Sequence, residues 1–129
     1  MKLDEMANRI ITAAYNEARY RKHEYFTPEH LLYSALFFSE GRELVEYCSA
    51  DIDTIKHELE GFFKEHIPMV DDREPVQTAG LSDLIQSTAF HAASAGKDII
   101  RLGDLLAAIY NQPESFAAHI LSSNGVKRL

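Results

Sequence analysis

The sequence is poor in cysteine, positive charge and long apolar runs, and each shortage excludes a class of protein. Its single cysteine, Cys48, cannot form a disulfide within the chain or hold a structural metal by itself. The 129 residues carry 13 Lys and Arg against 20 Asp and Glu, a net charge of −7. This acidity argues against nucleic acid or an anionic membrane surface as a partner, because both are bound through clustered cations. No apolar run approaches the ~20 residues of a spanning helix, and the acidic start Met1–Glu5 does not resemble a targeting peptide. We expect one reduced, cytoplasmic domain.

Motifs for nucleotide binding and hydrolysis are also absent. Gly96-Lys97 is the only Gly-Lys pair, and no glycine precedes it at phosphate-loop spacing. Neither a G-x-S-x-G elbow nor an H-E-x-x-H helix occurs. Cys48 ends an apolar helical face, which favours a small buried side chain over a nucleophile. We therefore expect no catalytic residue and no cofactor in this domain.

The histidines suggest an alternative function, that of a metal-dependent enzyme. Three pairs with a carboxylate are candidates: His57 with Glu60, three positions apart, and the neighbours His66 with Glu65 and His23 with Glu24. On a solvated helix, however, Glu60 forms an ordinary ion pair with Lys56 or Lys64. Because the sequence contains no closed set of three or four ligands, we expect no required metal.

Apolar residues recur at helical spacing along most of the chain, and breaks divide the pattern into separate helices. The stripes are Met6, Ala7, Ile10, Ile11, Ala14 and Ala18; Leu31, Leu32, Ala35 and Leu36; Leu44, Val45 and Cys48; Ile52, Ile55, Leu59, Phe62 and Phe63; and Leu81, Leu84, Ile85, Ala89 and Ala92. Thr27-Pro28-Glu29 is a helix start, Asp51 is a candidate cap, and Gly41 and Gly96 indicate breaks. No stretch alternates with period two for long enough to predict a sheet. The predicted fold class is all-α.

The second half of the chain repeats the pattern of the first. A shift of 75 carries Ile10, Ala14, Tyr15 and Ala18 onto Ile85, Ala89, Phe90 and Ala93, and a shift of 74 carries Leu31, Leu32, Ala35, Leu36 and Ile52 onto Leu105, Leu106, Ile109, Tyr110 and Val126. A single copy would expose a wide apolar face, so we expect two four-helix repeats related by a pseudo-twofold axis. Repeat one spans about 1–66, a linking loop 67–80, and repeat two about 81–129. The last helix, predicted to begin at Val126, would be truncated, as in a fragment of a longer protein.

The junction 19–30 concentrates charge of both signs and aromatic side chains between the first two helices. Phe26 has the position of a hydrophobic staple beside the Thr27 cap. Glu24 and Glu29 are typical of solvated carboxylates at helix ends. Tyr20 and Tyr25 would anchor a partner if exposed and would be packing residues if buried. The residues alone assign no partner here.

Three separated strings resemble the Clp N-terminal domain, which heads the Clp/Hsp100 AAA+ unfoldases. They are HEYFTPEHLL at 23–32, LVEYCSADI at 44–52 followed by HELE at 57–60, and Ala89-Phe90-His91. The second and third are similar to the ClpA type in particular, while ClpC and ClpB relatives share the first. The resemblance covers essentially the whole chain and implies the double four-helix repeat.

The resemblance also implies a function. Domains of this family have no ATPase activity, and ATP binds in separate ATPase modules. They recruit protein substrates and adaptors, and the ClpA type binds a ClpS-type adaptor that delivers N-degron proteins to the ClpP-containing protease. By position the adaptor contact would be made by Glu24, Glu29 and Thr78, with His23, Tyr20 and Tyr25 on the rim. The placement of Thr78 depends on where a gap is set in the linking loop, which is shorter here than in the ClpA pattern. The alternative is a ClpC, ClpB or stand-alone relative that binds substrates or other adaptors directly.

Overall fold

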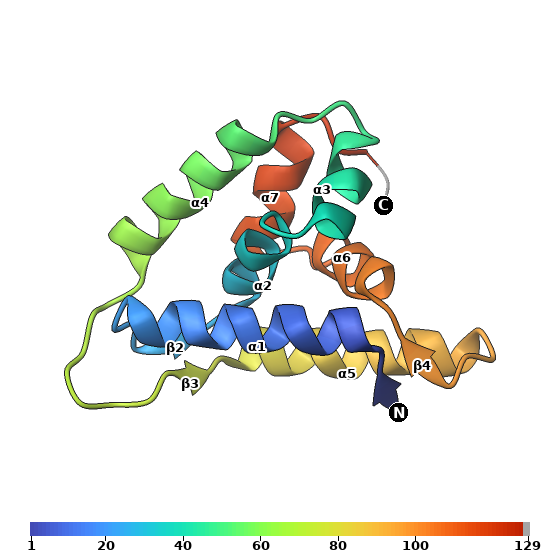
Figure 1. Cartoon of the computed structure of the whole chain (residues 1–129), viewed down its shortest axis with the longest axis horizontal. Helices are drawn as coiled ribbons and strands as arrows, with labels where there is room; N and C mark the ends of the chain where they lie inside the picture. Colours follow the sequence, from blue (N-terminus) through green and yellow to red (C-terminus); the bar gives the residue numbers. More distant parts are fainter. Residues whose placement is uncertain (128–129) are drawn as a thin grey trace.

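A computed structural model describes residues 1–127, which form seven helices and four two-residue strands (Figure 1). In chain order these are β1 (Lys2–Leu3), α1 (Glu5–Tyr20), β2 (Tyr25–Phe26), α2 (Pro28–Ala35), α3 (Ser39–Glu46), α4 (Ile52–His66), β3 (Val76–Gln77), α5 (Ala79–Ser94), β4 (Ile99–Ile100), α6 (Leu102–Tyr110) and α7 (Phe116–Ser123). The predicted helical fold class is confirmed.

Polar side chains start the helices where the sequence predicts them. Asp4 and Thr78 accept hydrogen bonds from backbone N–H groups in the first turns of α1 and α5, and Asp51 does so for α4. Thr27 is the N-cap of α2 and Pro28 its first residue, as predicted. These caps satisfy donors that the first helical turn leaves unpaired.

Gly41 does not break the helix there, contrary to expectation, but lies inside α3. The break falls earlier, at residues 36–38. A Cβ atom on Gly41 would stand 2.0 Å from the carbonyl oxygen of Ala35. Glycine is therefore required because the start of α3 lies directly against the end of α2.

The strands form two parallel ladders, each joining one repeat to the other. Lys2 and Leu3 pair with Ile99 and Ile100, and Tyr25 and Phe26 pair with Val76 and Gln77. Two residues are too few to produce an alternating pattern, so these strands could not be predicted from the sequence. Each strand lies 74 positions from its counterpart in the other repeat, as expected of a pseudo-twofold arrangement.

The buried faces of α1 and α5 also correspond at a shift of 74. Ala7, Ile10, Ala14 and Ala18 match Leu81, Leu84, Thr88 and Ala92. The shift of 75 inferred for these helices is therefore wrong by one residue. The reason is Thr88, whose hydroxyl donates to the carbonyl of Leu84 at 2.7 Å and so occupies a buried position as a polar residue.

The third helices of the two repeats, α3 and α7, correspond at a shift of 76. This shift changes which residue of repeat one matches Val126. Ser49 and Gly125 both have positive φ, 63° and 88°, and the residues after them, Ala50 and Val126, are both buried. Val126 thus matches Ala50 and not Ile52. Val126 and Lys127 are not helical, and the rest of the predicted last helix, residues 128–129, lies outside the described residues.

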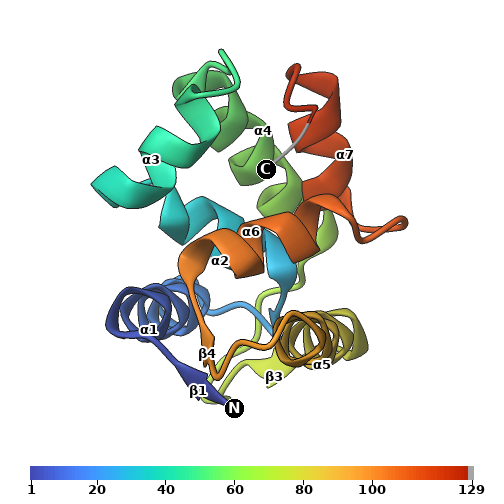
Figure 2. The same ribbon diagram turned by 90° about the vertical axis from the view of Figure 1, so that its right-hand side faces the viewer.

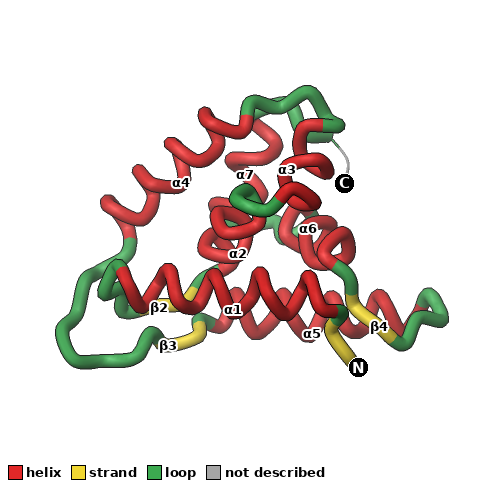
Figure 3. Tube along the Cα trace, viewed as in Figure 1, coloured by secondary structure: helices red, strands yellow, loops and turns green. Residues whose placement is uncertain are grey.

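One hydrophobic core spans both repeats. α1 and α5 form the base of the molecule, α2 and α6 lie above them, and α4 lies against α7 (Figure 2). The linking loop runs around one end of the base (Figure 3). It is tied to the junction after α1, because the N–H of Glu24 donates to the Pro68 carbonyl and that of Val70 to the Lys22 carbonyl.

Candidate functional site

The β2–β3 ladder brings Glu24 close to Thr78. The N–H of Val76 donates to the Glu24 carbonyl at 2.8 Å, and that of Thr78 donates to the Phe26 carbonyl at 3.1 Å. Glu24 is half-buried, and its carboxylate raises the pKa of Tyr25 by hydrogen bonding to the phenol. The ladder therefore places a carboxylate, a phenol and the α5 cap at one end of the molecule.

Both candidate anchor tyrosines are at the surface. Tyr20 is 84% exposed at the end of α1, and Tyr25 is 38% exposed on β2. Phe26, in contrast, is buried and makes an edge contact with Tyr15, with ring centroids 5.6 Å apart. Phe26 is thus a core residue, as its position beside the cap suggests.

Glu29 is not the solvated carboxylate that the sequence suggests. It is 5% exposed, and its Oε2 accepts hydrogen bonds from the N–H of Ala117 at 2.9 Å and the hydroxyl of Ser115 at 3.3 Å. The pattern failed because these donors come from α7 and its cap, 86 and 88 positions away. Glu29 holds the N-terminus of α7 through charge-assisted hydrogen bonds.

His23 does not lie on the rim of the expected adaptor contact, contrary to the prediction. The residue is buried, and its Nδ1 lies 2.9 Å from Nε2 of His30, a fully buried residue. The Nδ1 of His30 accepts from the Thr27 N–H at 3.1 Å, so the His30 proton is on Nε2 and points at His23. The pair is an internal part of the α2 N-terminus.

A groove of about 790 Å³ opens beside the ladder, between α4, α7 and the start of α5. We call it the α4–α7 groove. Glu29 and Thr78 both line it, while Tyr25 lies on the adjoining strand β2 and Glu24 directly precedes that strand. The structure therefore brings two of the three expected adaptor-contact residues to one groove.

Aromatic and imidazole rings line one wall of this groove. Phe62 on α4 and Phe116 on α7 have ring centroids 4.6 Å apart, and His66 lies 5.2 Å from Phe62. Phe116 is 38% exposed, and His119 extends the wall along α7. Flat rings of this kind supply contact area at little cost in conformational entropy.

Carboxylates also line the α4–α7 groove. Asp83 and Glu114 are exposed and join Glu29 in the lining. Gln112 lines the groove as well, and its side-chain amide donates to the Gly80 carbonyl at 2.8 Å. A groove lined by both aromatic rings and carboxylates suits a protein segment that carries both apolar and basic side chains.

Sequence reasoning missed the wall of rings. Phe62 belongs to an apolar stripe typical of a buried helix face, and no motif in the sequence points to Phe116 or His119. The sequence offers little to indicate this contact. Phe116 directly follows the Ser115 cap, which predicts only a helix start, and its ring partner Phe62 is 54 positions away. Only the fold brings the two together.

His57, Glu60 and Cys48 do not line the α4–α7 groove. Within residues 1–127, no group of three or more His, Cys, Asp or Glu side chains is placed to hold a metal ion. His57 and Glu60 stand 3.9 Å apart on an exposed face. Cys48 is half-buried, with its sulfur 4.0 Å from the Leu44 carbonyl. No helix in the described part of the chain is long and apolar enough to cross a membrane.

Comparison with known proteins gives consistent matches. Residues 2–124 match the sequence profile of the Clp repeat (R) N-terminal domain. A ClpA homolog protein from Fuscovulum blasticum is 31% identical over 122 residues, covering 92% of this chain but only 15% of that relative.

Solved structures agree on the fold. The N-terminal domain of the ClpV1 ATPase of E. coli is 26% identical, with a TM-score of 0.79 and coverage of 93% of this chain and 76% of that one. A ClpV N-domain in complex with a VipB peptide is 18% identical, with a TM-score of 0.79 and coverage of 96% and 79%.

Proposed function

Because the chain belongs to the Clp repeat (R) N-terminal domain family, we propose that it docks adaptor or substrate proteins for a longer cytoplasmic Clp/Hsp100 unfoldase. The match to a ClpA homolog of which this chain spans 15% supports a parent with separate ATPase modules. In this proposal those modules bind ATP and engage ClpP, and the domain itself carries no catalytic residue.

The α4–α7 groove is the observation that carries the proposal. Its rings offer apolar contact area, while Glu24 beside it and Asp83 and Glu114 within it give a negative potential. Such a potential speeds the approach of a basic partner and fixes its orientation. A ClpS-type adaptor presenting a lysine is the partner that we favour.

The contact would centre on Glu24 and Thr78, with Tyr25 and Tyr20 on the rim. Glu29 contributes differently from these residues, because its carboxylate already holds α7. Replacing Glu29 would disturb the groove by releasing α7, so loss of binding in such a variant would not identify a direct contact.

Calorimetric titration with the ClpS-type adaptor of the same organism tests the proposal. We expect saturable one-to-one binding that Glu24→Lys weakens by about tenfold or more, as truncation of an interface hot spot does. Glu46→Lys is the matched control, since Glu46 is exposed at the far end of α3 and the change in charge is the same. Equal affinity for both variants would reject the Glu24 surface.

A ClpV-type role is the second candidate, favoured by the solved neighbours. One of them is a ClpV N-domain bound to a VipB peptide, which supports docking of a short peptide rather than a folded adaptor. Titration with a VipB-type peptide distinguishes the two roles. Binding of the peptide without binding of the adaptor would assign the ClpV-type role.

A further inference from the structure

The linking loop between α4 and β3, residues 67–75, closes on a single residue of the junction after α1. The N–H of Glu24 donates to the Pro68 carbonyl at 2.9 Å, and the Glu24 carbonyl accepts from the Val76 N–H at 2.8 Å. Both ends of the loop are therefore fixed to the backbone of one residue, whose carboxylate is an expected adaptor contact. Ends this close are typical of a compact Ω-type loop rather than an open tether.

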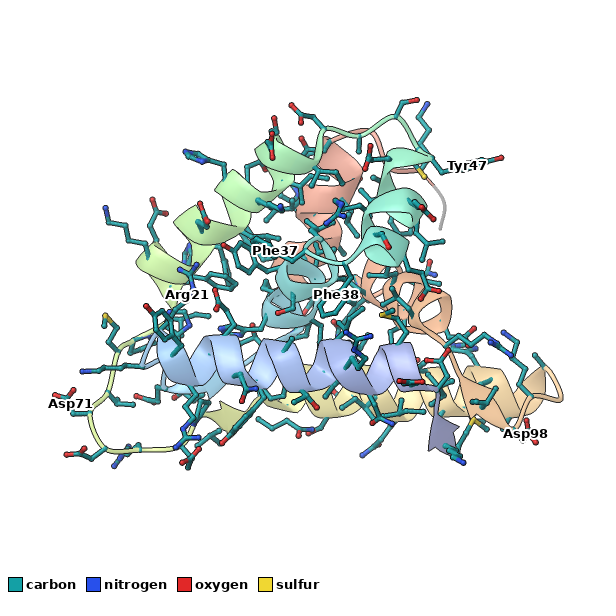
Figure 4. All side chains as sticks on the ribbon, in the orientation of Figure 1. Arg21, Phe37, Phe38, Tyr47, Asp71 and Asp98 are labelled. Carbon is teal, nitrogen blue, oxygen red and sulfur yellow. The ribbon has the colours of Figure 1, made fainter. Side chains whose placement is uncertain are left out.

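A backbone hydrogen bond and two ion pairs also join the loop to the end of α1. The N–H of Val70 donates to the Lys22 carbonyl at 2.8 Å. The Lys22 ammonium lies 3.7 Å from Asp71, and the Arg19 guanidinium lies 3.6 Å from Glu74. Figure 4 shows Asp71 on the outer side of the loop. A partner therefore meets a loop that is already in place, which lowers the entropy cost of binding.

Exposed apolar side chains gather on this loop, its following strand and the junction. Nine large apolar side chains are exposed among the described residues, and four of them lie here: Tyr20, Tyr25, Met69 and Val76. Met69 is 69% exposed and Val76 is 59% exposed. Because these segments are a small part of the chain, the gathering indicates a surface that binds another protein.

Backbone pairing brings two of these apolar residues next to Glu24. Met69 forms an antiparallel bridge with His23, the residue before Glu24, and Val76 pairs with Tyr25, the residue after it. Side chains directly opposite each other in a ladder are neighbours, so Val76 lies beside Tyr25. The Glu24 carboxylate hydrogen-bonds to the Tyr25 phenol and therefore lies next to this apolar pair.

The charges around Glu24 favour a basic partner. Glu24 forms no ion pair among residues 1–127. The neighbouring cations Lys22 and Arg19 are instead paired with Asp71 and Glu74 of the linking loop. The loop thus offsets positive charge that would otherwise repel a basic side chain approaching Glu24.

A carboxylate beside exposed apolar side chains suits both parts of a lysine, whose ammonium group binds an anion while its four-carbon stem packs on apolar surface. We propose that the linking loop is the apolar half of the adaptor contact. Met69 and Val76 pack against a partner segment in which apolar side chains surround the lysine that binds Glu24. This inference rests on the proposed function, because it takes the Glu24 surface as the docking site. The loop is then a recognition element as well as the link between the repeats.

Substitutions that keep the shape of the loop and remove its apolar character test this proposal. The double variant Met69→Gln, Val76→Thr retains the Val76 backbone N–H that bonds to Glu24. In calorimetric titration with the ClpS-type adaptor of the same organism, we expect its affinity to be about tenfold lower than that of the original protein. The heat capacity change of binding should also be less negative, because less apolar surface is buried.

Two further variants locate the effect. Phe90→Gln is the matched control, since Phe90 is as exposed as Met69 but lies in the second half of α5, and it should bind the adaptor like the original protein. Glu24→Lys should reduce the dependence of the affinity on salt, whereas the double loop variant should retain that dependence. Thermal melting followed by circular dichroism confirms that each variant is folded.

The outcomes separate this inference from the proposed function. Absence of adaptor binding by the original protein would reject the adaptor role and this inference with it. Binding that Glu24→Lys weakens and the double loop variant leaves unchanged would reject only the role of the loop. An equal loss of affinity in Phe90→Gln would also overturn the inference, because the effect would then not be local to the loop.

Discussion

At the scale of single residues, the buried histidine pair fixes the chemistry of the α2 N-terminus. Thr27 donates to His30, and His30 donates to His23, so each imidazole is held neutral in one tautomer. Burial, and after it the neighbouring charges of His23 and Arg21, together lower the pKa of His30 to about 3. Burial also lowers the pKa of His23. Protonation of either ring would set N–H against N–H.

This pair makes the fold sensitive to acid. The unfolded chain takes up a proton at His30 below about pH 6.5 and the folded chain does not, so stability is complete above that pH and falls as the pH drops toward 3. At pH 5 we expect His30 alone to account for a loss of about 2 kcal/mol. Urea unfolding at pH 7.5 and pH 5 measures this. His30→Gln should reduce the loss of unfolding free energy between pH 7.5 and pH 5, whereas the exposed-site control His57→Gln should not. An equal loss in the two variants would disprove the role of His30.

We predict opposite effects on stability when alanine replaces Gly41 and Gly61. Gly41→Ala places a methyl group 2.0 Å from the Ala35 carbonyl oxygen, and we expect a loss of about 2–3 kcal/mol or more from overpacking. Gly61 lies in the middle of α4 with nothing within 4 Å of an added Cβ, so Gly61→Ala should raise stability by about 0.5–1 kcal/mol. Urea unfolding compares them, and a tolerated Gly41→Ala would contradict the close approach of α3 to α2.

At the scale of elements, helix α7 depends on a side chain from α2. It is eight residues long, and its first N–H groups bond to Ser115 and Glu29. A helix this short gains little stability from its own hydrogen bonds, so tertiary contacts hold it in place. The aromatic wall of the α4–α7 groove depends on this anchorage because Phe116 is the first residue of α7.

Removal of the Glu29 carboxylate should therefore loosen α7. We expect Glu29→Ala to cost about 2–3 kcal/mol, because it removes a charged acceptor and leaves the Ala117 N–H buried without a partner. Hydrogen exchange should speed up in α7 before other helices. The exposed neighbour Glu114 provides the control, and Glu114→Ala should change stability by less than about 0.5 kcal/mol. Unchanged exchange in α7 would refute the anchor.

The sequence could predict the helices better than the contacts between them. Caps and apolar spacing located α2 and α4 because Thr27, Asp51 and their stripes act locally. Thr88 concealed the true register of the repeat, since a threonine bonded to its own helix is buried without being apolar. His23 and Glu29 resemble surface residues because their partners, imidazole and backbone N–H, are supplied by folding. The α4–α7 groove could not be predicted from the sequence for the same reason.

At the scale of the whole molecule, neither repeat has a core of its own. The main apolar cluster includes Ile10 and Leu59 of repeat one together with Leu106 and Ile120 of repeat two. Both ladders join one repeat to the other, and the Asp4 N–H donates across to the Ile100 carbonyl at 2.9 Å. The two halves therefore stabilise each other.

Separate halves should be unfolded and should recover structure when mixed. We expect residues 1–71 and residues 72–129, expressed apart, to show little helical circular dichroism, because each would expose the apolar face that the other covers. Mixing should restore the signal at a rate that rises with concentration. A stable helical fold in either half alone would contradict the shared core.

The crossed ladders have a consequence for the origin of this architecture. A single repeat has one strand before its first helix and one before its second, and each pairs with the opposite strand of another repeat. Two free copies of such a unit would assemble as a symmetric homodimer. The loop at 67–75 replaces that association with a tether, which supplies an effective concentration on the order of millimolar and frees each copy to diverge. Tyr33 and Ala107 stand at corresponding positions, 74 residues apart, and differ. Two copies of one sequence could not differ in this way.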